Sequence, residues 1–377
     1  MEKEYKEFQK KIYDCLVDYK EKHITRDCGK YKGEEHTAFL PEKFWTEELP
    51  AMLYDGIRET VREIQSSEFK YKPHIFAFKH VASSQTACVN LFVPIMESES
   101  VNDILKSIEA CPKDFKCVAK EQLFHGYRFE FWDTTDEKSK GLLGDHSKQA
   151  GTDSDVAIAY YNTDDELCLW LIEHKLTEQE FTACGGYKSK GNDEEGKAKC
   201  RSCSMEDILN NPDICYYHRV CKYNYWNIMK DGGAEFYVKA YEGKGCPFRG
   251  GMNQLWRNQL LAMALEKEGT YKKVYFSVVH HPENYFLDKS MFEYAKLTDY
   301  SPKFNSFTSD KLIDAASIDG SLKEKKTAEV TIFTAKCNAA IDVAKELEAL
   351  RIKAERKHRE AEKQYEAFCK RNGIKGK

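Results

Sequence analysis

Two short stretches decide the fold of this chain: GTDSDVAI at residues 151–158 and LWLIEHK at residues 169–175. Both are predicted to be buried strands, because each is a short apolar run bounded by turn residues. Side chains alternate between the two faces of a strand, so Glu173 and Lys175 share one face of the second strand. If the two strands pair as a hairpin, Asp155 meets Glu173 and Lys175 at one point. An apolar strand has no structural use for charged groups there.

The three charged residues indicate a metal site. Two carboxylates at one point can hold a hard divalent cation through oxygen. A lysine beside them can position a water or neutralise phosphate charge. The alternative is a surface hairpin with a salt bridge, but the apolar run at residues 169–172 leaves no polar face for a solvated hairpin. The residues alone therefore predict a metal site on an α/β sheet.

Flanking segments complete the pattern. A helix is expected at residues 80–92, with Ser83 or Ser84 as its N-cap. The residues at 127–132 alternate in polarity as a strand does. Downstream, residues 252–265 predict a helix and residues 274–279 a further buried strand. The expected order is therefore helix, three strands, helix, strand.

This order, with Asp155 and then Glu173-His174-Lys175, resembles the PD-(D/E)XK nuclease superfamily, in a bacterial branch with a cysteine-rich insertion. The family places one acid at the start of a strand and acid-any-lysine at the end of the next. Ser154 stands where the family has a proline, a position that varies. The resemblance covers roughly residues 78–285. It implies an α/β restriction-endonuclease-like core, a mixed central sheet flanked by helices, with helical N- and C-terminal extensions.

The resemblance also implies a function. It predicts an endodeoxyribonuclease-like phosphodiesterase that uses Mg²⁺ or Mn²⁺ and hydrolyses DNA, with a role in defence against foreign DNA. Asp155 and Glu173 would bind the metal, and Lys175 would orient the attacking water. Two alternatives stay open: an RNA nuclease of the same fold, and a non-catalytic nucleic-acid-binding module that uses the cysteine knuckle.

Length and composition set outer limits. The chain has 377 residues, 41% hydrophobic and 32% charged, and a net charge of −4, as expected for a globular protein. We expect a helical N-terminal extension at residues 1–66, a nuclease-like core at 67–285 and a mainly helical extension at 286–377. The helix expected at 336–370 either packs on its own domain or pairs with a second copy, so a homodimer or a defence-system partner stays open. No signal sequence or membrane span is expected, which predicts a cytoplasmic protein.

A second candidate metal centre lies in the cysteine-rich insertion at residues 182–250, which holds six of the 14 cysteines. Cys200 and Cys203 have the C-x₂-C spacing of a zinc knuckle. Cys200, Cys203 and Cys215 are the preferred ligands, with Cys184 as the fourth. The spacing Cys215-x₂-His218-x₂-Cys221 could also complete a set of four, so the choice of ligands stays open. Zinc is the default metal. An iron–sulfur cluster is the alternative, because some nucleases of the superfamily carry one. Unligated thiols are the third possibility.

Further polar residues are weaker candidates. Gln254 and Arg257 lie on one stripe of the helix that begins at Met252, and the resemblance places this helix beside nucleic acid. Arg257 would then hold a phosphate, and Gln254 the nucleic-acid backbone or a metal-bound water. Polar groups that satisfy buried backbone are an equal alternative. Glu130 is interpreted as a salt-bridged residue, with a metal ligand as the alternative.

Overall fold

The computed structural model describes residues 2–45, 51–66, 78–134, 136, 138–147, 151–233 and 245–318. The chain divides into two compact units, Met1–Leu322 and Lys323–Lys377, and all described residues belong to the first. The helix predicted at 336–370 lies outside the described residues. Within those residues, no helix has the length and apolar character needed to cross a membrane.

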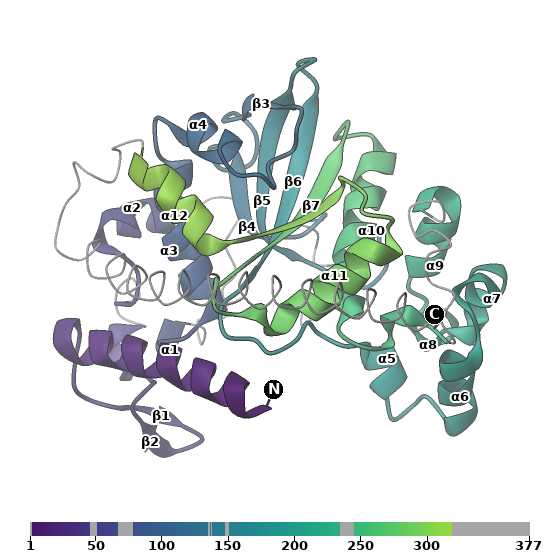
Figure 1. Ribbon diagram of the computed structural model, residues 1–377, viewed down its shortest axis with the longest axis horizontal. Coiled ribbons are helices and arrows are strands. Elements are labelled where there is room, and N and C mark those ends of the chain that lie inside the picture. Colours follow the sequence, from purple (N-terminus) through teal and green to yellow (C-terminus); the bar gives the residue numbers. More distant parts are fainter. Residues whose placement is uncertain are drawn as a thin grey trace, which may run out of the picture. The chain divides into compact units, whose positions relative to one another are not determined.

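A mixed sheet of six strands forms the centre of the described unit (Figure 1). Its order is β3-β5-β6-β7-β8, and β4 pairs with the other half of β5. The pairs that involve β3, β4, β5 and β6 are antiparallel, whereas β6–β7 and β7–β8 are parallel. The strands are β3 (Phe115–Val118), β4 (Tyr127–Phe131), β5 (Ser154–Asn162), β6 (Leu167–Lys175), β7 (Val274–His280) and β8 (Phe304–Thr308).

The predicted hairpin is confirmed as β5 and β6. Val156 pairs with Ile172, and the register runs without a break to Tyr161 and Leu167. The turn is stabilised by Asn162, whose side-chain oxygen accepts hydrogen bonds from the backbone N–H groups of residues 164 and 166. Such a side chain replaces the backbone bonds that a tight turn leaves open. Local chemistry therefore sets the register that brings the charged residues together.

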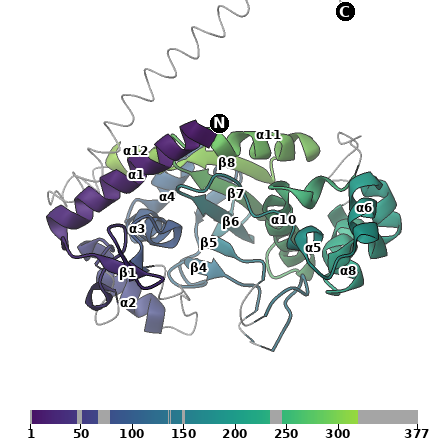
Figure 2. The same cartoon turned by 90° about the horizontal axis from the view of Figure 1, so that it is seen from below.

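Strand alternation divides the core between the two faces of the sheet. Val156 and Trp170 pack in one hydrophobic cluster, and Ala157 and Leu171 pack in a second. Helices α2, α3, α4 and α12 contribute to the first cluster, and α10 and α11 contribute to the second (Figures 1 and 2). Both faces of the sheet are thus buried, which explains why the sequences of its strands are continuous runs of apolar residues. These helices are α2 (Arg58–Ser66), α3 (Ser84–Met96), α4 (Val101–Lys106), α10 (Met252–Glu268), α11 (Asp288–Leu297) and α12 (Ser309–Ile318).

The expected order of helix, three strands, helix, strand is confirmed by α3, β4, β5, β6, α10 and β7. Ser83 caps α3, because its hydroxyl oxygen accepts a hydrogen bond from the backbone N–H of Thr86. Two strands lie outside this order. β3 joins β5 before the hairpin, and β8 pairs with β7 after residue 285. The central sheet therefore continues into the segment that was expected to be a mainly helical extension.

The insertion between β6 and α10 consists of short helices and irregular chain. Its helices are α5 (Gly185–Lys188), α6 (Glu194–Ser202), α7 (Met205–Asn210), α8 (Tyr216–Arg219) and α9 (Tyr225–Ile228). It is not wholly polar inside, because Trp226 and Phe248 are buried against Trp256 of α10. The insertion thus shares the hydrophobic cluster of α10.

The N-terminal segment is only partly helical. It holds α1 (Glu2–His23) and a small antiparallel pair, β1 (Gly29–Tyr31) and β2 (Glu34–His36), which the sequence did not predict. Phe8 of α1 is buried and packs against the rings of His281 and Phe286. The helix thereby contacts the loop that follows β7.

Candidate active site

Three carboxylate residues lie in a row across the sheet. Phe129 of β4 pairs with Val156 of β5, which pairs with Ile172 of β6. The next row of this register consists of the residue after Phe129, the residue before Val156 and the residue after Ile172, because the strands are antiparallel. These residues are Glu130, Asp155 and Glu173, and they lie side by side. The carboxylate of Asp155 accepts a hydrogen bond of 2.7 Å from the backbone N–H of His174. The strand register thus converts three separate positions in the sequence into one acidic line.

Glu173 is the most heavily contacted member of this line. Lys175 donates to one carboxylate oxygen of Glu173 at 2.8 Å, and Gln254 donates to the same oxygen at 2.6 Å. Asn258 donates to the other oxygen at 2.7 Å. Glu173 and Lys175 are 4% and 8% exposed, so these contacts form in a largely dry environment. Such contacts hold the carboxylate in one orientation, as a ligand site requires.

Burial and mutual repulsion raise the pKa values of the acids around Glu173. Burial, followed by the charge of Glu173, raises the pKa of Asp155 well above its usual value. The pKa of Glu130 is raised to about 8, first by burial and then by Asp153. Burial and the charge of Glu173 raise the pKa of Asp153 to about 6. Burial is the first cause of each shift, and repulsion between neighbouring carboxylates is the second.

Lys175 is the cation of the site. Burial alone would lower its pKa, but the charges of Glu173, Glu178 and Asp155 outweigh burial and raise it. Lys175 therefore stays protonated across the ordinary pH range. A protonated lysine donates hydrogen bonds and stabilises negative charge, whereas it cannot accept a proton.

Glu130 differs from its interpretation as a salt-bridged residue. Its carboxylate accepts a hydrogen bond of 2.8 Å from the side-chain amide of Gln85, near the start of α3. Its backbone has a φ of 46°, in the left-handed region that residues with a Cβ seldom adopt. This conformation interrupts the alternation of β4: Phe129 packs in the first hydrophobic cluster, but Phe131 packs in the second. Such strain is concentrated at functional sites.

Helix α10 brings Gln254 into the site but gives Arg257 a different environment. Arg257 donates to the hydroxyl of Thr152 at 3.1 Å and lies 3.9 Å from the carboxylate of Asp145. Its side chain is 16% exposed. Asp145 also accepts a hydrogen bond from the hydroxyl of Tyr225 in the insertion. Arg257 therefore joins α10, the segment before β5 and the insertion, while its contact with nucleic acid stays a prediction.

The donor set fits a hard divalent cation in chemistry. All its acidic groups are carboxylates, which are oxygen ligands of the kind that such a cation prefers, and added positive charge would stabilise the ionised forms of Glu130, Asp153 and Asp155, whose pKa values are raised. Within the described residues, no three histidine, cysteine, aspartate or glutamate side chains are already placed around one ion.

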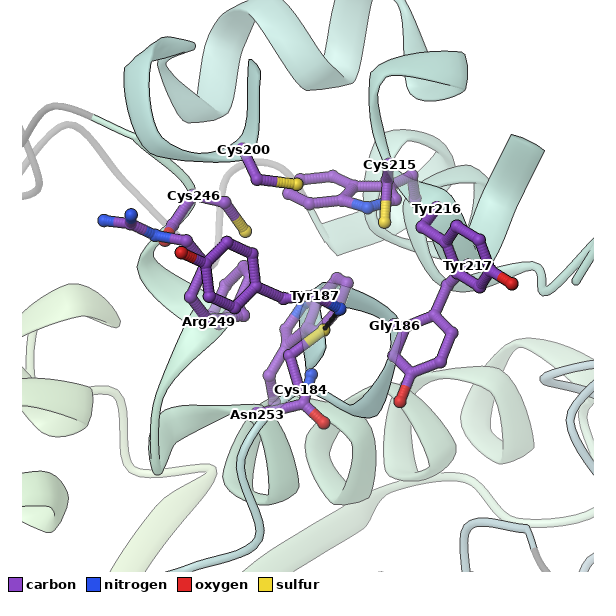
Figure 3. A pocket seen from close by; sticks show the side chains of 13 residues that line it. Cys184, Gly186, Tyr187, Cys200, Cys215, Tyr216, Tyr217, Cys246, Arg249 and Asn253 are labelled. Atoms are coloured by element: carbon purple, nitrogen blue, oxygen red, sulfur yellow. Dashed lines mark hydrogen bonds between the residues drawn. The ribbon is translucent and has the colours of Figure 1, made fainter. Parts of the chain in front are cut away.

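The insertion contains a cavity lined by four cysteines, Cys184, Cys200, Cys215 and Cys246 (Figure 3). Three of them are among the predicted ligands, but Cys203 does not line the cavity, and Cys246 takes the fourth place. The reason is geometric. Cys200 lies within α6, which ends at Ser202, and Cys203 has an extended backbone beyond that end.

Sequence reasoning did not assign three residues to the site. Asp153 lies two positions before Asp155, and strand alternation would have placed both on one face. Asn258 lies one helical turn after Gln254 and shares its stripe, so it was recognisable from spacing. Gln85 had no such signal, because its contact with Glu130 joins α3 to β4.

The fold and the acidic line together define a restriction-endonuclease-like protein, with a mixed sheet flanked by helices and Asp155, Glu173 and Lys175 at one end of its central hairpin. The chain belongs to the family REase-ARP, described as restriction endonuclease associating with ARP, which it matches over residues 10–330. The protein is therefore a nuclease of the restriction endonuclease class. No curated protein and no solved structure matches the chain significantly.

Proposed function

We propose that the protein is a Mg²⁺-dependent nuclease that hydrolyses phosphodiester bonds of DNA. The observation that carries the proposal is the line formed by Glu130, Asp155 and Glu173, with Lys175 hydrogen-bonded to its end. Membership in a restriction endonuclease family supports DNA as the substrate. Mn²⁺ has the same ligand preference and would replace Mg²⁺.

Each residue has a defined part in this proposal. Asp155 and Glu173 hold the cation, helped by a backbone carbonyl near His174. When bound, the cation supplies Lewis acidity toward a phosphate oxygen and toward the attacking water. Lys175 orients that water and offsets negative charge that develops on the phosphate, because it stays protonated. Gln254 and Asn258 position Glu173 through their hydrogen bonds.

The restriction endonuclease class also supports proposals about the substrate, the partner and the biological role of this protein. An RNA nuclease of this fold is the second candidate, since the acidic line does not distinguish the two sugars. The description of the family names an association with ARP, so we propose that the nuclease works with a partner protein, in defence against foreign DNA. A homodimer is the other assembly to consider. A second metal centre in the insertion, zinc or iron–sulfur, belongs to the same prediction.

One experiment tests the activity directly. Purified protein is incubated with plasmid, linear DNA and RNA of matched length, each with Mg²⁺, with Mn²⁺ or with EDTA. We expect nicked or linear plasmid with either metal and intact plasmid with EDTA. Cleavage of RNA alone would select the second candidate. Binding without cleavage under every metal condition would favour the non-catalytic binding module.

A further inference from the structure

We propose that Tyr5 and Asn284 position Lys175 by holding the bend of the chain that follows it. The proposal rests on the nuclease function proposed above, because it assigns residues that support Lys175 in that reaction. Both residues are far from Lys175 in the sequence: Tyr5 lies in α1, and Asn284 lies in the loop after β7. Figure 1 shows α1 at the end of the sheet opposite the turn between β5 and β6, which is the end where Lys175 lies.

The strand that carries Lys175 loses one of its two neighbours before it ends. The register between β5 and β6 stops at Ile172, whereas β6 pairs with β7 as far as Lys175. On the β5 side, the backbone N–H of His174 donates to the carboxylate of Asp155 instead. A strand end held by one neighbour opens locally more easily than an end held by two. The end of β6 therefore needs further contacts to stay in one place.

The chain bends directly after Lys175, at Leu176 and Thr177. A bend takes the backbone out of reach of a neighbouring strand, so its polar groups need other partners. The carboxylate of Glu178 accepts a hydrogen bond of 2.7 Å from the backbone N–H of Leu176. The three carbonyls of residues 176–178 accept hydrogen bonds from side chains of distant segments.

Asn284 binds two of these carbonyls. Its side-chain nitrogen donates to the carbonyl of Leu176 at 3.2 Å and to the carbonyl of Glu178 at 2.9 Å. An amide nitrogen has two hydrogens, so both donors serve this one segment. Asn284 is 0% exposed, so water does not compete for these bonds. A buried donor of this kind is costly to leave without its partner, which keeps the bend in contact with Asn284.

Tyr5 binds the carbonyl between these two. Its hydroxyl donates to the carbonyl of Thr177 at 2.8 Å. The side-chain amide of Gln9, one turn further along α1, donates to the same hydroxyl at 3.0 Å. A hydroxyl that accepts one bond and donates another is held in one orientation. The bend is thus tied to α1 as well as to the loop after β7.

The two tethers form one clamp, because α1 also contacts the loop that carries Asn284. The ring of Tyr5 meets the ring of Phe286 edge to face, with centroids 5.3 Å apart. Lys11 of α1 forms a salt bridge of 2.7 Å with Glu283, whose side chain is only 15% exposed. Helix α1 is therefore fixed to both parts that hold the bend.

This clamp matters for the proposed reaction because the side chain of Lys175 is long and its ammonium must lie at one point beside Glu173. A displacement of about 1 Å in a reacting group can cost on the order of a hundredfold in rate. Tyr5 and Asn284 donate to the backbone after Lys175 and act through it. They are positioning residues, and Lys175 itself is the group that would meet the substrate.

The test compares Tyr5→Phe and Asn284→Ala with the unmodified full-length protein. Tyr19→Phe is the control, because Tyr19 lies further along α1 and packs on the ring of His23. Cleavage of a DNA duplex with Mg²⁺ gives kcat and KM at a temperature well below each unfolding midpoint. Hydrogen exchange of the metal-free protein, followed by mass spectrometry, measures the opening of residues 173–178 without any need for activity.

We expect Tyr5→Phe to lower kcat by roughly tenfold with an unchanged KM, because the lysine is displaced while the DNA contacts remain. Asn284→Ala should lower kcat further, since it releases two carbonyls. Both changes should speed hydrogen exchange in residues 173–178. Tyr19→Phe should match the unmodified protein in every measurement. If Asn284→Ala does not fold, Tyr5→Phe, which removes a single oxygen atom, still decides.

Three outcomes would overturn the proposal. A kcat within about twofold of the unmodified value, in folded protein with faster exchange, would mean that the clamp serves stability alone. A lower kcat without faster exchange would mean that these residues act in some way other than by holding the bend. If the unmodified protein cleaved no nucleic acid, the proposed function would fail and the catalytic role of the clamp with it, whereas the exchange rates would still show whether Tyr5 and Asn284 hold the bend.

Discussion

The carboxylate site and the cysteine cavity are assembled in different ways. Asp155 and Glu173 lie on adjacent strands, and a hairpin with a short turn sets their separation. Cys184, Cys200, Cys215 and Cys246 lie in separate turns of an insertion that has no sheet to align them. Strand pairing repeats regularly, so a site built on it can be inferred from spacing. A site built from loops depends on how the whole loop closes.

Of the two regions, the carboxylate site is where we expect substitutions to have the largest effect. Glu173→Gln or Lys175→Ala should lower the cleavage rate by on the order of a hundredfold or more, because each removes a charge that the reaction uses. Glu173→Gln removes one of several buried like charges, so its unfolding midpoint should change little, whereas Lys175→Ala leaves Glu173 buried without its cation and should lower the midpoint. Rates come from plasmid cleavage, and midpoints from thermal unfolding followed by circular dichroism.

Glu180→Gln is the matched control for this pair, because Glu180 is an exposed acid a few residues after β6. It should cleave as the unmodified protein does. If both active-site variants kept more than about a tenth of the rate, the catalytic assignment would be wrong.

A second prediction concerns the link between the two regions. Arg257→Ala should lower the free energy of unfolding by about 2 kcal/mol, because it leaves Asp145 and Thr152 buried with one partner fewer. The measurement is denaturant unfolding with fluorescence detection. Lys267→Ala is the control on the same helix, since its bridge to Asp231 is exposed and should be worth at most about 1 kcal/mol.

If Arg257→Ala instead left stability unchanged and weakened DNA binding, the earlier interpretation of Arg257 as a phosphate ligand would be supported. Binding would be measured with a Glu173→Gln background to prevent cleavage. The dependence of DNA affinity on salt concentration distinguishes a structural role of Arg257 from a phosphate contact. Loss of a phosphate contact makes the affinity less sensitive to salt, whereas loss of a structural contact does not.

A third prediction sharpens the role of α10. Gln254→Ala should raise the Mg²⁺ concentration needed for half-maximal activity by roughly tenfold, because Glu173 loses a contact that orients it. Gln254 also accepts a hydrogen bond from the backbone N–H of Thr182, at the start of the insertion. An unchanged metal requirement with a lower unfolding midpoint would show that the residue serves only to hold the insertion.

The smallest effect is expected in the dependence of stability on pH. The folded-state pKa of Glu130 is about 8 against an ordinary value of 4.5, because burial disfavours its charged form. The folded protein therefore keeps a proton that the unfolded chain has lost, so metal-free stability should fall as pH rises from 4.5 toward 8. Glu130→Gln should flatten this dependence, because an amide at this position takes up no proton on folding.

Added Mg²⁺ provides the check on that prediction. A cation bound to ionised carboxylates should stabilise the protein more at the alkaline end of the window than at the acidic end. Thermal unfolding with and without Mg²⁺ measures the difference. Equal stabilisation at both ends would mean that the cation binds elsewhere.

Much of the fold and part of the site follow from local pattern. Alternation and turn residues predicted β5, β6 and the face shared by Glu173 and Lys175, and Ser83 was recognisable as a helix cap. The step to a nuclease came from the resemblance, which the family match supports. The left-handed backbone of Glu130 was not predictable, because nothing in β4 announces it.

The sequence by itself determined the acidic hairpin, since the period of a strand and the chemistry of a tight turn act over a few residues. Only the tertiary structure placed Glu130 beside Asp155, paired Arg257 with Asp145, and selected Cys246 over Cys203 at the cavity. Each of these contacts joins segments far apart in the chain. Their formation depends on the packing of α3, α10 and the insertion against the sheet. The spacing of residues within a short segment does not predict such packing.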